Sequence, residues 1–439
     1  MESRLLIAAA HSGAGKTTVT LGLLRALQKK GYTVQPFKCG PDYIDTKHHQ
    51  VASGNDSINL DKYMMSDEHI RQLYHQYGAT ADVCITEGVM GLFDGSRKME
   101  GSSADIARLL QIPVVLVLNA KAMAYSAAAI LYGLKNFCSD IRIAGVIFNF
   151  VGSSSHYRFL QEACEDVGVH SFGYLPSNDA LHIKSRHLGL DILSPAHMEA
   201  SIAAAADHIE KYINVDTLLE HTKADVPDTS NVLPSSRNTN STHKNILIAQ
   251  DAAFNFIYPE NIHALKQFGT VRYFSPLSAT HLPDADLIYL PGGYPELHLE
   301  ELSANITIME QLVTYYANGG KILAECGGMM YLGKHITDEK GKSWPMTGIL
   351  ELATSMEPPK LSLGYRTIIT GTQPVKGHEF HYSQFSDVGT NRTDVPIPVY
   401  NARNEPTPSR IFHNNQLFAS YIHLYWAENP VIIAELLNR

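Results

Sequence analysis

Residues 8–20 read AAAHSGAGKTTVT and join an apolar run to a glycine-containing turn and a lysine followed by two threonines. A strand that passes through such a turn into a helix presents backbone N–H groups at the helix N-terminus, where they bind phosphate. We expect Lys16 to reach the β- and γ-phosphates of ATP and the Thr17 hydroxyl to bind Mg²⁺. The predicted ATP-binding residues are Ser12, Gly13, Gly15, Lys16, Thr17 and Thr18.

This loop departs from the strict phosphate-loop spacing at one position. Ala10 stands where the pattern G-x-x-x-x-G-K-[ST] has its first glycine. Alanine is tolerated there only if the residue has a negative φ. An ordinary strand–helix turn is the alternative interpretation. The SGAGKTT core lies between an apolar run and a helical stretch, and this context favours the phosphate loop.

Three carboxylates follow apolar runs that we interpret as strands. Asp42 and Asp45 lie in the segment KCGPDYID after the second run, and Glu87 follows the third. In an open α/β sheet, ligands bind at the carboxyl ends of the strands, so these acids are expected to face the phosphate loop. Such oxygen ligands are what a magnesium nucleotide needs. A solvated loop carboxylate is the alternative for any one of them.

A second group of residues that could take part in catalysis surrounds Cys326, in the segment GKILAECGGMM of residues 320–330. An apolar strand ends at the cysteine and a helix-like stretch begins after it, which predicts the elbow that exposes a nucleophile. The backbone N–H of Gly327 is then available to bind an oxyanion, and the helix N-terminus is expected to favour the thiolate. A buried structural cysteine is the alternative, but the small neighbours Ala324 and Gly328 suit the tight turn.

A nucleophilic thiol needs a base, and His423 in the apolar segment ASYIHLYW is our candidate. A further glycine turn, LPGGYPE, follows another apolar run, and its Gly293 is predicted to supply a second oxyanion N–H. The segment His378–His381 carries two histidines and one glutamate, which are too few ligands for a metal site. We expect a substrate contact or a structural role there.

Near-continuous apolar runs alternate with helical stretches, which predicts α/β domains with parallel strands. In the first half the expected strands are Arg4–Ala10, Thr33–Lys38, Val83–Thr86, Val114–Leu118 and Ile141–Asn149, and the clearest expected helices are Thr17–Lys30 and Ala104–Leu110. In the second half the expected strands are Asn245–Ala249, Leu287–Leu290 and Ile322–Ala324. The polar, aperiodic stretch between the halves predicts a domain at 1–215, a linker at 216–243 and a domain at 244–439.

The composition of the chain excludes several classes of partner and location. The 439 residues include 35 basic and 44 acidic side chains, a net charge of −9 that argues against a nucleic-acid partner. No apolar run approaches the length of a membrane span, and the N-terminus lacks the features of a secretory signal. Five scattered cysteines without a CxxC pair suit a reducing cytoplasm. The sequence leaves the oligomeric state open, with a homodimer as one option.

Taken together, these segments resemble the cobyrinic acid a,c-diamide synthase family, glutamine-dependent amidotransferases of cobalamin biosynthesis. The resemblance covers nearly the whole chain apart from the linker. It rests on motifs in the family's order: SGAGKTT, KCGPDYID, EGVMGLFDG, SSADIARLL, GVIFNFVGS, SRHLGL, DAAFNFIYPEN, PGGYPELH, AECGGMMYLG, GHEFHYS and SYIHLYW. KCGPDYID in particular separates this family from the cobyric acid synthases.

The resemblance implies two doubly wound domains, one similar to dethiobiotin synthetase and one similar to class I glutaminases. It implies a carbon–nitrogen ligase in which a cysteine releases ammonia from glutamine and ATP with Mg²⁺ activates tetrapyrrole carboxylates as acyl phosphates. It assigns Cys326 and His423 to catalysis and Thr17 and Glu87 to the metal. It further assigns Asp42, Asp45, Glu87 and Asp94 to contacts with Mg²⁺, ATP or the substrate carboxylate.

The chain departs from the family's wider pattern at three places, one of which is the Ala9–Ala10 start of the phosphate loop, where family members often have glycine. Tyr425 occupies the place where many class I glutaminases carry a glutamate that orients the histidine, so we expect a Cys–His dyad. Asn119 stands where we expect aspartate, and we give it no role. Two alternatives stay open at this point: the same reaction on hydrogenobyrinic acid or Ni-sirohydrochlorin, and a phosphate-loop ATPase switch with a partner-binding C-terminal domain. A stand-alone glutaminase would leave the phosphate loop unexplained.

Overall fold

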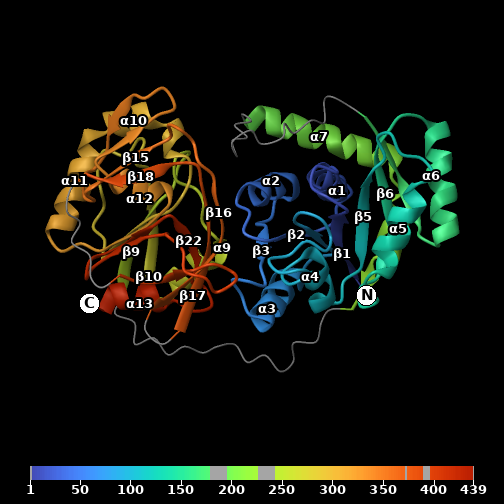
Figure 1. The fold of residues 1–439 in the computed structure, drawn as a ribbon, viewed down its shortest axis with the longest axis horizontal. Helices are drawn as coiled ribbons and strands as arrows, with labels where there is room; N and C mark the ends of the chain where they lie inside the picture. Colours follow the sequence, from blue (N-terminus) through green and yellow to red (C-terminus); the bar gives the residue numbers. More distant parts are fainter. Residues whose placement is uncertain (1, 178–194, 226–242, 371–372, 389–395, 439) are drawn as a thin grey trace. The chain divides into compact units, whose positions relative to one another are not determined.

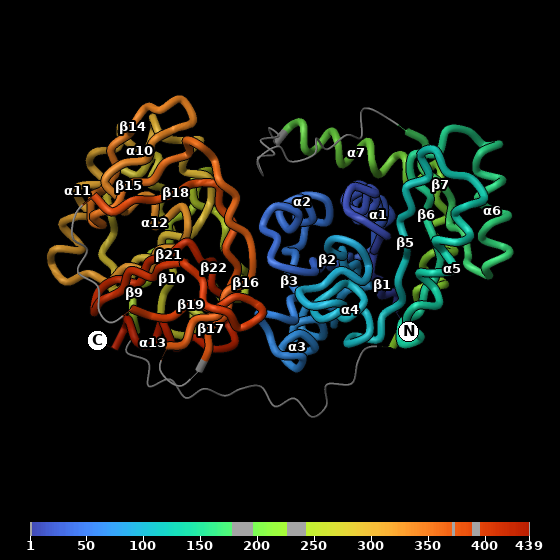
Figure 2. The backbone as a smooth tube through the Cα atoms, in the orientation of Figure 1, coloured from blue at the N-terminus to red at the C-terminus, as the bar shows by residue number. Residues whose placement is uncertain are grey.

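The computed structural model describes residues 2–177, 195–225, 243–370, 373–388 and 396–438. By the contacts within it, the chain divides into two compact units, Met1–Pro234 and Ser235–Arg439 (Figure 1). Figure 2 traces the backbone of both units, coloured along the sequence. Among the described residues, no helix combines the length and the apolar character that crossing a membrane requires.

The first unit is built on one sheet with the strand order β3-β2-β4-β1-β5-β6-β7, in which all neighbours along this order run parallel. A short eighth strand, β8, pairs antiparallel with β1. The strands are β1 (Glu2–Ala9), β2 (Val34–Cys39), β3 (Ile58–Leu60), β4 (Val83–Glu87), β5 (Val114–Asn119), β6 (Ile143–Val151), β7 (Ser171–Pro176) and β8 (Lys223–Ala224). The five strands predicted for this half are confirmed to within two residues at each end.

Helices cover both faces of this sheet, because right-handed crossovers that move in opposite directions along a sheet lie on opposite faces. Figure 1 shows α1 and α7 on one side of the strands and α3 and α4 on the other. The helices are α1 (Lys16–Lys29), α2 (Ile44–Ser53), α3 (Asp67–Gly78), α4 (Ser103–Leu110), α5 (Ala127–Asn136), α6 (Ser154–Val167), α7 (Pro195–Tyr212) and α8 (Val215–His221). The predicted doubly wound arrangement is confirmed.

The second unit contains a six-stranded sheet with the order β10-β9-β11-β12-β21-β20, parallel except at β20. Alternate residues of its strands enter two separate cores, with Leu247 and Ala249 on one face and Ile246 and Ile248 on the other. The strands are β9 (Lys244–Ala249), β10 (Gly269–Phe274), β11 (Leu287–Leu290), β12 (Ile322–Glu325), β20 (Ile411–His413) and β21 (Leu417–Ser420). This sheet contains the three strands predicted for the second half.

Side chains of α10, α11 and α12 pack on one face of this sheet and those of α9 and α13 on the other. The helices are α9 (Pro259–Lys266), η2 (Pro295–Leu297), α10 (Leu299–Ala304), α11 (Ile306–Ala317), α12 (Gly327–Leu332) and α13 (Val431–Asn438). Two further four-stranded sheets, which the sequence patterns did not indicate, complete the unit. Their strands are β13 (His335–Thr337), β14 (Ser343–Pro345), β15 (Leu352–Ser355), β16 (Ser362–Thr370), β17 (Gln373–His381), β18 (Gln384–Asp387), β19 (Val399–Tyr400) and β22 (Ile422–Tyr425).

The first residues of the predicted linker pack with the first unit. α8 begins where the linker was expected, with Val215 and Leu218 buried in the core of the first unit. β8 follows it and pairs with β1, and the hydroxyls of Ser3 and Thr222 are hydrogen-bonded at 2.6 Å. Two apolar residues in a short helix gave too weak a periodic signal to be recognised. Residues 226–242 of the predicted linker and the SRHLGL motif lie outside the described residues.

Candidate active sites

The loop between β1 and α1 bends around two glycines. Gly13 and Gly15 have φ values of 78° and 96°, in the left-handed region that residues with a Cβ avoid. A Cβ on Gly15 would lie 2.0 Å from Nδ2 of Asn149, the amide that donates a hydrogen bond to the Ala14 carbonyl at 3.0 Å. Ala10 has no positive φ, so its side chain adds no strain. The predicted ATP-binding residues thus share one loop and the helix after it: Ser12, Gly13, Gly15, Lys16, Thr17 and Thr18.

The first turn of α1 carries the predicted lysine and threonine. The Lys16 ammonium donates a hydrogen bond to the Met90 carbonyl at 2.6 Å. Burial lowers the pKa of Lys16, although the nearby Glu87 acts in the opposite direction. The Thr17 hydroxyl donates to Oε1 of Glu87 at 2.7 Å. The loop and the end of β4 therefore meet, as the sequence predicts for the carboxyl edge of a parallel sheet.

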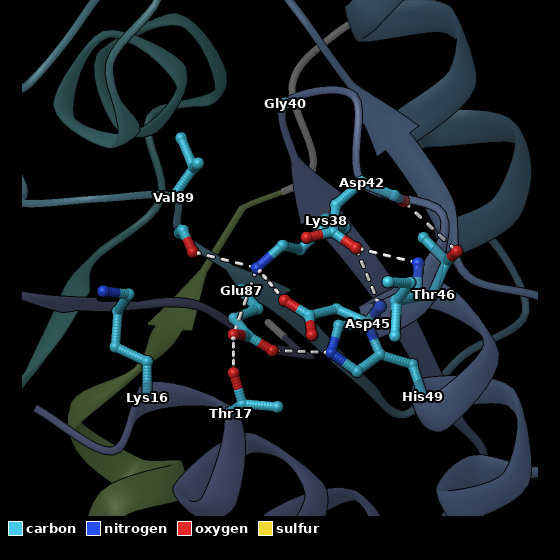
Figure 3. Close-up of polar contacts among 12 residues, drawn as sticks. Lys16, Thr17, Lys38, Gly40, Asp42, Asp45, Thr46, His49, Glu87 and Val89 are labelled. Atoms are coloured by element: carbon cyan, nitrogen blue, oxygen red, sulfur yellow. Dashed lines mark hydrogen bonds and ion pairs between the residues drawn. The ribbon is translucent and has the colours of Figure 1, made fainter. Parts of the chain in front are cut away.

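Figure 3 shows the Glu87 carboxylate within a buried polar cluster. Its Oε1 accepts hydrogen bonds from Thr17 at 2.7 Å and from Lys38 at 3.1 Å, and its Oε2 lies 2.7 Å from Nε2 of His49. The Lys38 ammonium also pairs with Asp45 at 2.7 Å. The side chains of Lys38, Asp45 and Glu87 are 4%, 9% and 1% exposed, so these charges compensate one another away from water.

The electrostatics of this cluster favour the charged forms. Burial alone would raise the pKa of Glu87, but Lys38, His49 and Thr17 outweigh it and lower that pKa. Burial likewise opposes the charge on Lys38, and Asp45 and Glu87 reverse the effect and raise its pKa. The cluster is thus an ionised network at neutral pH.

The two remaining predicted acids lie differently. Oδ1 of Asp42 accepts hydrogen bonds from the N–H groups of Ile44 and Asp45 at 2.8 Å each, so Asp42 shapes the first turn of α2 beside the cluster. Asp94 is exposed, and its carboxylate accepts a hydrogen bond from the Gly91 N–H of its own turn at 2.9 Å. The structure therefore brings Asp42 next to the cluster and leaves Asp94 outside its hydrogen bonds.

In the second unit, Cys326 occupies the junction between β12 and α12 with φ 45° and ψ −106°. A positive φ strains any residue with a Cβ and is typical of a nucleophile elbow. The Cys326 N–H donates to the Ser420 carbonyl at 2.7 Å, and its carbonyl accepts from the Met330 N–H at 2.9 Å. A Cβ on Gly328 would lie 2.0 Å from the Leu290 carbonyl oxygen, so the turn needs glycine there.

The two glycines predicted for the oxyanion site lie side by side. A Cβ on Gly327 would lie 3.3 Å from the backbone nitrogen of Gly293 and 2.7 Å from Cδ of Pro295. The Gly327 N–H is hydrogen-bonded toward the Cys326 thiol. Two backbone N–H groups on adjoining turns beside a nucleophile suit an oxyanion.

His423 belongs to β22, which pairs antiparallel with β17 and has His378 directly opposite His423. Glu325, the residue before the cysteine, accepts a hydrogen bond at 3.0 Å from the N–H of Leu424, the residue after the histidine. A Cβ on Gly292 would lie 2.1 Å from Cε1 of His423, so this glycine packs against the imidazole ring. The strands that carry the predicted nucleophile and base are thus linked directly.

The expectation that the helix N-terminus favours a thiolate is wrong for this structure. Burial raises the pKa of Cys326, the nearby Glu296 raises it further, and the single Gly327 N–H does not compensate. Burial and two neighbouring histidines lower the pKa of His423 to about 3. The thiol and the imidazole are therefore both neutral at pH 7 in the absence of a ligand. α12 has six residues, so its dipole is weak.

The segment expected to have a substrate or structural role is held by a buried carboxylate. Glu379 on β17 accepts hydrogen bonds from Arg366 at 2.5 Å and Ser409 at 2.7 Å, and lies 3.0 Å from Nε2 of His381. Burial would raise the pKa of Glu379, but these partners outweigh it and lower the pKa to about 2. The Glu379 carboxylate thus holds β17 in place, and β22 pairs with β17.

Comparison with known proteins agrees with this two-site architecture. A family model described as the CobQ/CobB/MinD/ParA nucleotide binding domain matches residues 5–190. A second, described as the CobB/CobQ-like glutamine amidotransferase domain, matches residues 245–431. The chain is 38% identical to the cobyrinate a,c-diamide synthase of Saccharolobus solfataricus, over 97% of this chain and 98% of that protein. The chain belongs to the cobyrinate a,c-diamide synthase family.

Other members of this family are similar to the chain over nearly its whole length. It is 40% identical to the cobyrinate a,c-diamide synthase of Picrophilus torridus, over 98% of this chain and 96% of that protein. It is 42% identical to the hydrogenobyrinate a,c-diamide synthase of Brucella anthropi, over 95% of this chain and 97% of that protein. The family predicted from the motifs is therefore confirmed.

In this member of the cobyrinate a,c-diamide synthase family, the sequence did not predict a role for three polar residues of the first site. Lys38 opens the KCGPDYID motif, and its place at a strand end was the available signal. His49 follows Asp45 by one helical turn, which puts both side chains on one face of α2. Asn59 donates hydrogen bonds to the carbonyls of Gly40 and Asp42, at 2.8 Å and 3.0 Å, and no local pattern pointed to it.

Proposed function

We propose that this chain uses ATP and glutamine to convert the a and c carboxylates of cobyrinate into carboxamides. The names of its relatives support this substrate. The observation that carries the proposal is that a buried phosphate-loop cluster and a cysteine elbow occur in one chain. A phosphate-loop switch does not require the elbow, and a stand-alone glutaminase does not require the cluster.

In the glutaminase reaction, the Cys326 sulfur attacks the side-chain carbonyl carbon of glutamine. Its proton passes to the neutral imidazole of His423 and then to the leaving nitrogen, so that ammonia departs and a glutamyl thioester remains. The N–H groups of Gly327 and Gly293 stabilise the oxyanion. Water then hydrolyses the thioester and releases glutamate. A thiol that is neutral at rest fits this sequence, because its proton is the one that the leaving group requires.

In the synthetase reaction, an oxygen of the substrate carboxylate attacks the γ-phosphorus of ATP and ADP leaves. The resulting acyl phosphate is a far better electrophile than a carboxylate. Ammonia attacks its carbonyl carbon and phosphate departs, and the cycle repeats at the second carboxylate. Lys16 and Lys38 supply the positive charge that phosphoryl transfer needs. Asp42 and Asp45, beside Lys38, are our candidates for orienting the substrate.

We further propose Thr17 and Glu87 as ligands of Mg²⁺. Oγ1 of Thr17 and Oε1 of Glu87 are 2.7 Å apart. Two adjacent ligands of an octahedral Mg²⁺, each about 2.1 Å from the ion, stand about 3 Å apart, so these atoms fit with a small shift. Both donors are oxygens, which Mg²⁺ prefers. When bound with ATP, the ion neutralises charge that develops on the phosphates.

The test is mass spectrometry of the product formed from cobyrinate, ATP, Mg²⁺ and glutamine. We expect a diamide, and we expect the Cys326→Ala variant to form the same diamide only when ammonium salt replaces glutamine. ATP hydrolysis without any amide product, by a folded protein with either nitrogen donor, would contradict the proposal.

Hydrogenobyrinate is the second candidate substrate, because the relative in Brucella anthropi is named for it. The two macrocycles, together with Ni-sirohydrochlorin, should be compared side by side at equal concentration. We place the reaction in the cytoplasm, because all five cysteines are free thiols and Cys326 must remain one.

A further inference from the structure

His49 is a fully buried histidine on α2 that the proposed reaction steps do not use. Its relative exposure is 0%, and Figure 3 shows its ring beside the Glu87 carboxylate. Asp45 precedes it by one helical turn, so α2 presents both side chains on the face that meets the cluster. Asp45 binds Lys38 of β2 and His49 binds Glu87 of β4. One helix is thus tied to two neighbouring strands.

Both ring nitrogens of His49 have partners. Nε2 lies 2.7 Å from Oε2 of Glu87, and Nδ1 lies 3.0 Å from the Ser57 hydroxyl. An ionised carboxylate only accepts hydrogen bonds, so Nε2 must carry the proton. The His49 carbonyl in turn accepts from the Ser53 hydroxyl at 2.8 Å. These contacts hold the ring in one orientation.

The two carboxylate oxygens of Glu87 have different hydrogen-bond partners. Oε2 is taken by His49, whereas Oε1 meets Thr17 and Lys38 on the side of the phosphate loop. Without a donor at Oε2, the carboxylate would be free to rotate or to offer both oxygens to a cation. Buried partners of this kind orient metal ligands and tune their affinity.

We propose that His49 is a positioning residue that holds Oε2 of Glu87, so that only Oε1 is presented beside Thr17 to the metal of a magnesium nucleotide. This inference rests on the proposed ATP site. It predicts that the contact to Glu87, and not merely a polar side chain at this position, determines metal affinity.

Two amide variants separate the two ring contacts. His49→Gln places an amide nitrogen near the position of Nε2 and keeps the donor to Glu87. His49→Asn is shorter, places its amide near Nδ1, and keeps the Ser57 partner while losing Glu87. His75→Gln, on α3 outside the cluster, controls for the chemical change itself. Both His49 variants place an amide in the same buried space, so we expect them to change the folding stability by similar amounts.

The readout is binding of Mn²⁺ in the presence of a non-hydrolysable ATP analogue, measured by electron paramagnetic resonance, alongside melting temperature. We expect His49→Asn to raise the Mn²⁺ Kd by about 10- to 100-fold, and His49→Gln to stay within about threefold of wild type. In ammonia-driven amidation, the Mg²⁺ concentration for half-maximal rate should rise in the same order. His75→Gln should match the wild type in every measurement.

Equal Mn²⁺ affinities of the Asn and Gln variants would overturn the inference, whether both bind as the wild type does or both are equally weakened. Thr17→Val in the same assay tests the proposed function separately. If Thr17→Val binds Mn²⁺ as tightly as the wild type, the metal site itself is misassigned. If Thr17→Val binds weakly and His49→Asn binds normally, only the role of His49 is wrong.

Discussion

The two candidate sites are both buried, but the first holds charged side chains and the second holds neutral ones. In the first unit, the Lys38 ammonium lies 2.7 Å from Asp45 and 3.1 Å from Glu87, and the pKa values of Lys38 and Glu87 are shifted toward their charged forms. In the second unit, burial raises the pKa of Cys326 and lowers that of His423 to about 3, so both are neutral. Burial is common to both sites, and the difference lies in the compensating charges.

This difference matches the proposed chemistry of each site. Phosphoryl transfer needs fixed charges before ATP arrives, because positioning and neutralisation are most of its catalysis. Thioester formation instead needs a proton that moves from sulfur to the leaving nitrogen, which a neutral pair supplies. A change at one site should therefore leave the reaction of the other site intact.

The largest expected effect is that of Cys326→Ala on glutamine-driven amidation. Because no thioester can form, the rate with glutamine should fall by about 10⁴-fold or more. Amidation with ammonium salt, at a pH that supplies free ammonia, should persist because the first site is unchanged. Both rates are measured by product formation. Loss of both activities in a folded variant would mean that Cys326 has another role.

Lys16→Ala should lower amidation with either nitrogen donor by about 10²- to 10³-fold, because a cation at the γ-phosphate is removed. Glutamine hydrolysis alone should continue. Lys29→Ala is the matched control: it lies on the same helix, and its ammonium pairs with Asp207 at the surface at 2.9 Å. Near-normal ammonia-driven turnover of Lys16→Ala would refute the phosphate-loop assignment.

Asp45→Asn should lower kcat of ammonia-driven amidation by about 10- to 100-fold, since the amide no longer neutralises Lys38. The melting temperature should fall as well, because removing one partner of a buried ion pair leaves an uncompensated charge. Asp56→Asn, an exposed acid just after α2, should leave both unchanged. An unchanged kcat for Asp45→Asn would mean that Asp45 has only a structural role.

The smallest effect concerns acid stability. The folded-state pKa of His423 is about 3, whereas an unfolded histidine has a value of about 6.5. Between these values the unfolded chain binds a proton that the native chain does not, so stability falls as pH falls. Lowering the pH from 6.5 to 5 should cost the wild type about 2 kcal/mol more than His423→Asn.

Denaturant unfolding at the two pH values measures this difference. Glu379 acts in the same direction at lower pH, but the wild type and the variant share it, so the comparison isolates His423. Identical pH dependence of the two proteins would mean that His423 is not held neutral.

Features with a local signature were predictable from the sequence. The apolar run of β1, the glycines of the phosphate loop and the small residues around Cys326 each specify backbone geometry within a few residues. The antiparallel sheets were not predicted, because β16 and β17 mix polar and apolar residues without a clear alternation. β22 was recognised only as an apolar strand, and its pairing with β17 was invisible.

The unpredicted part of the first site arises from pairing between distant strands. β2 pairs with β4 in a register that sets Lys38 directly opposite Glu87, although 49 residues separate them. His49 joins the same cluster only after α2 packs on this sheet. The neutral state of Cys326 was mispredicted for a related reason, since burial depends on the whole unit and helix position alone does not reveal it.

The close approach of Gly292 to His423 has a consequence for how the protein tolerates variation. Gly292 does not have a positive φ, so its backbone would accept any ordinary residue. The restriction is the imidazole, which lies 2.1 Å from where a Cβ would be. In a saturation library selected for growth on the glutamine-dependent reaction, position 292 should accept glycine alone. A library that also replaces His423, selected on ammonia, should accept alanine and serine there.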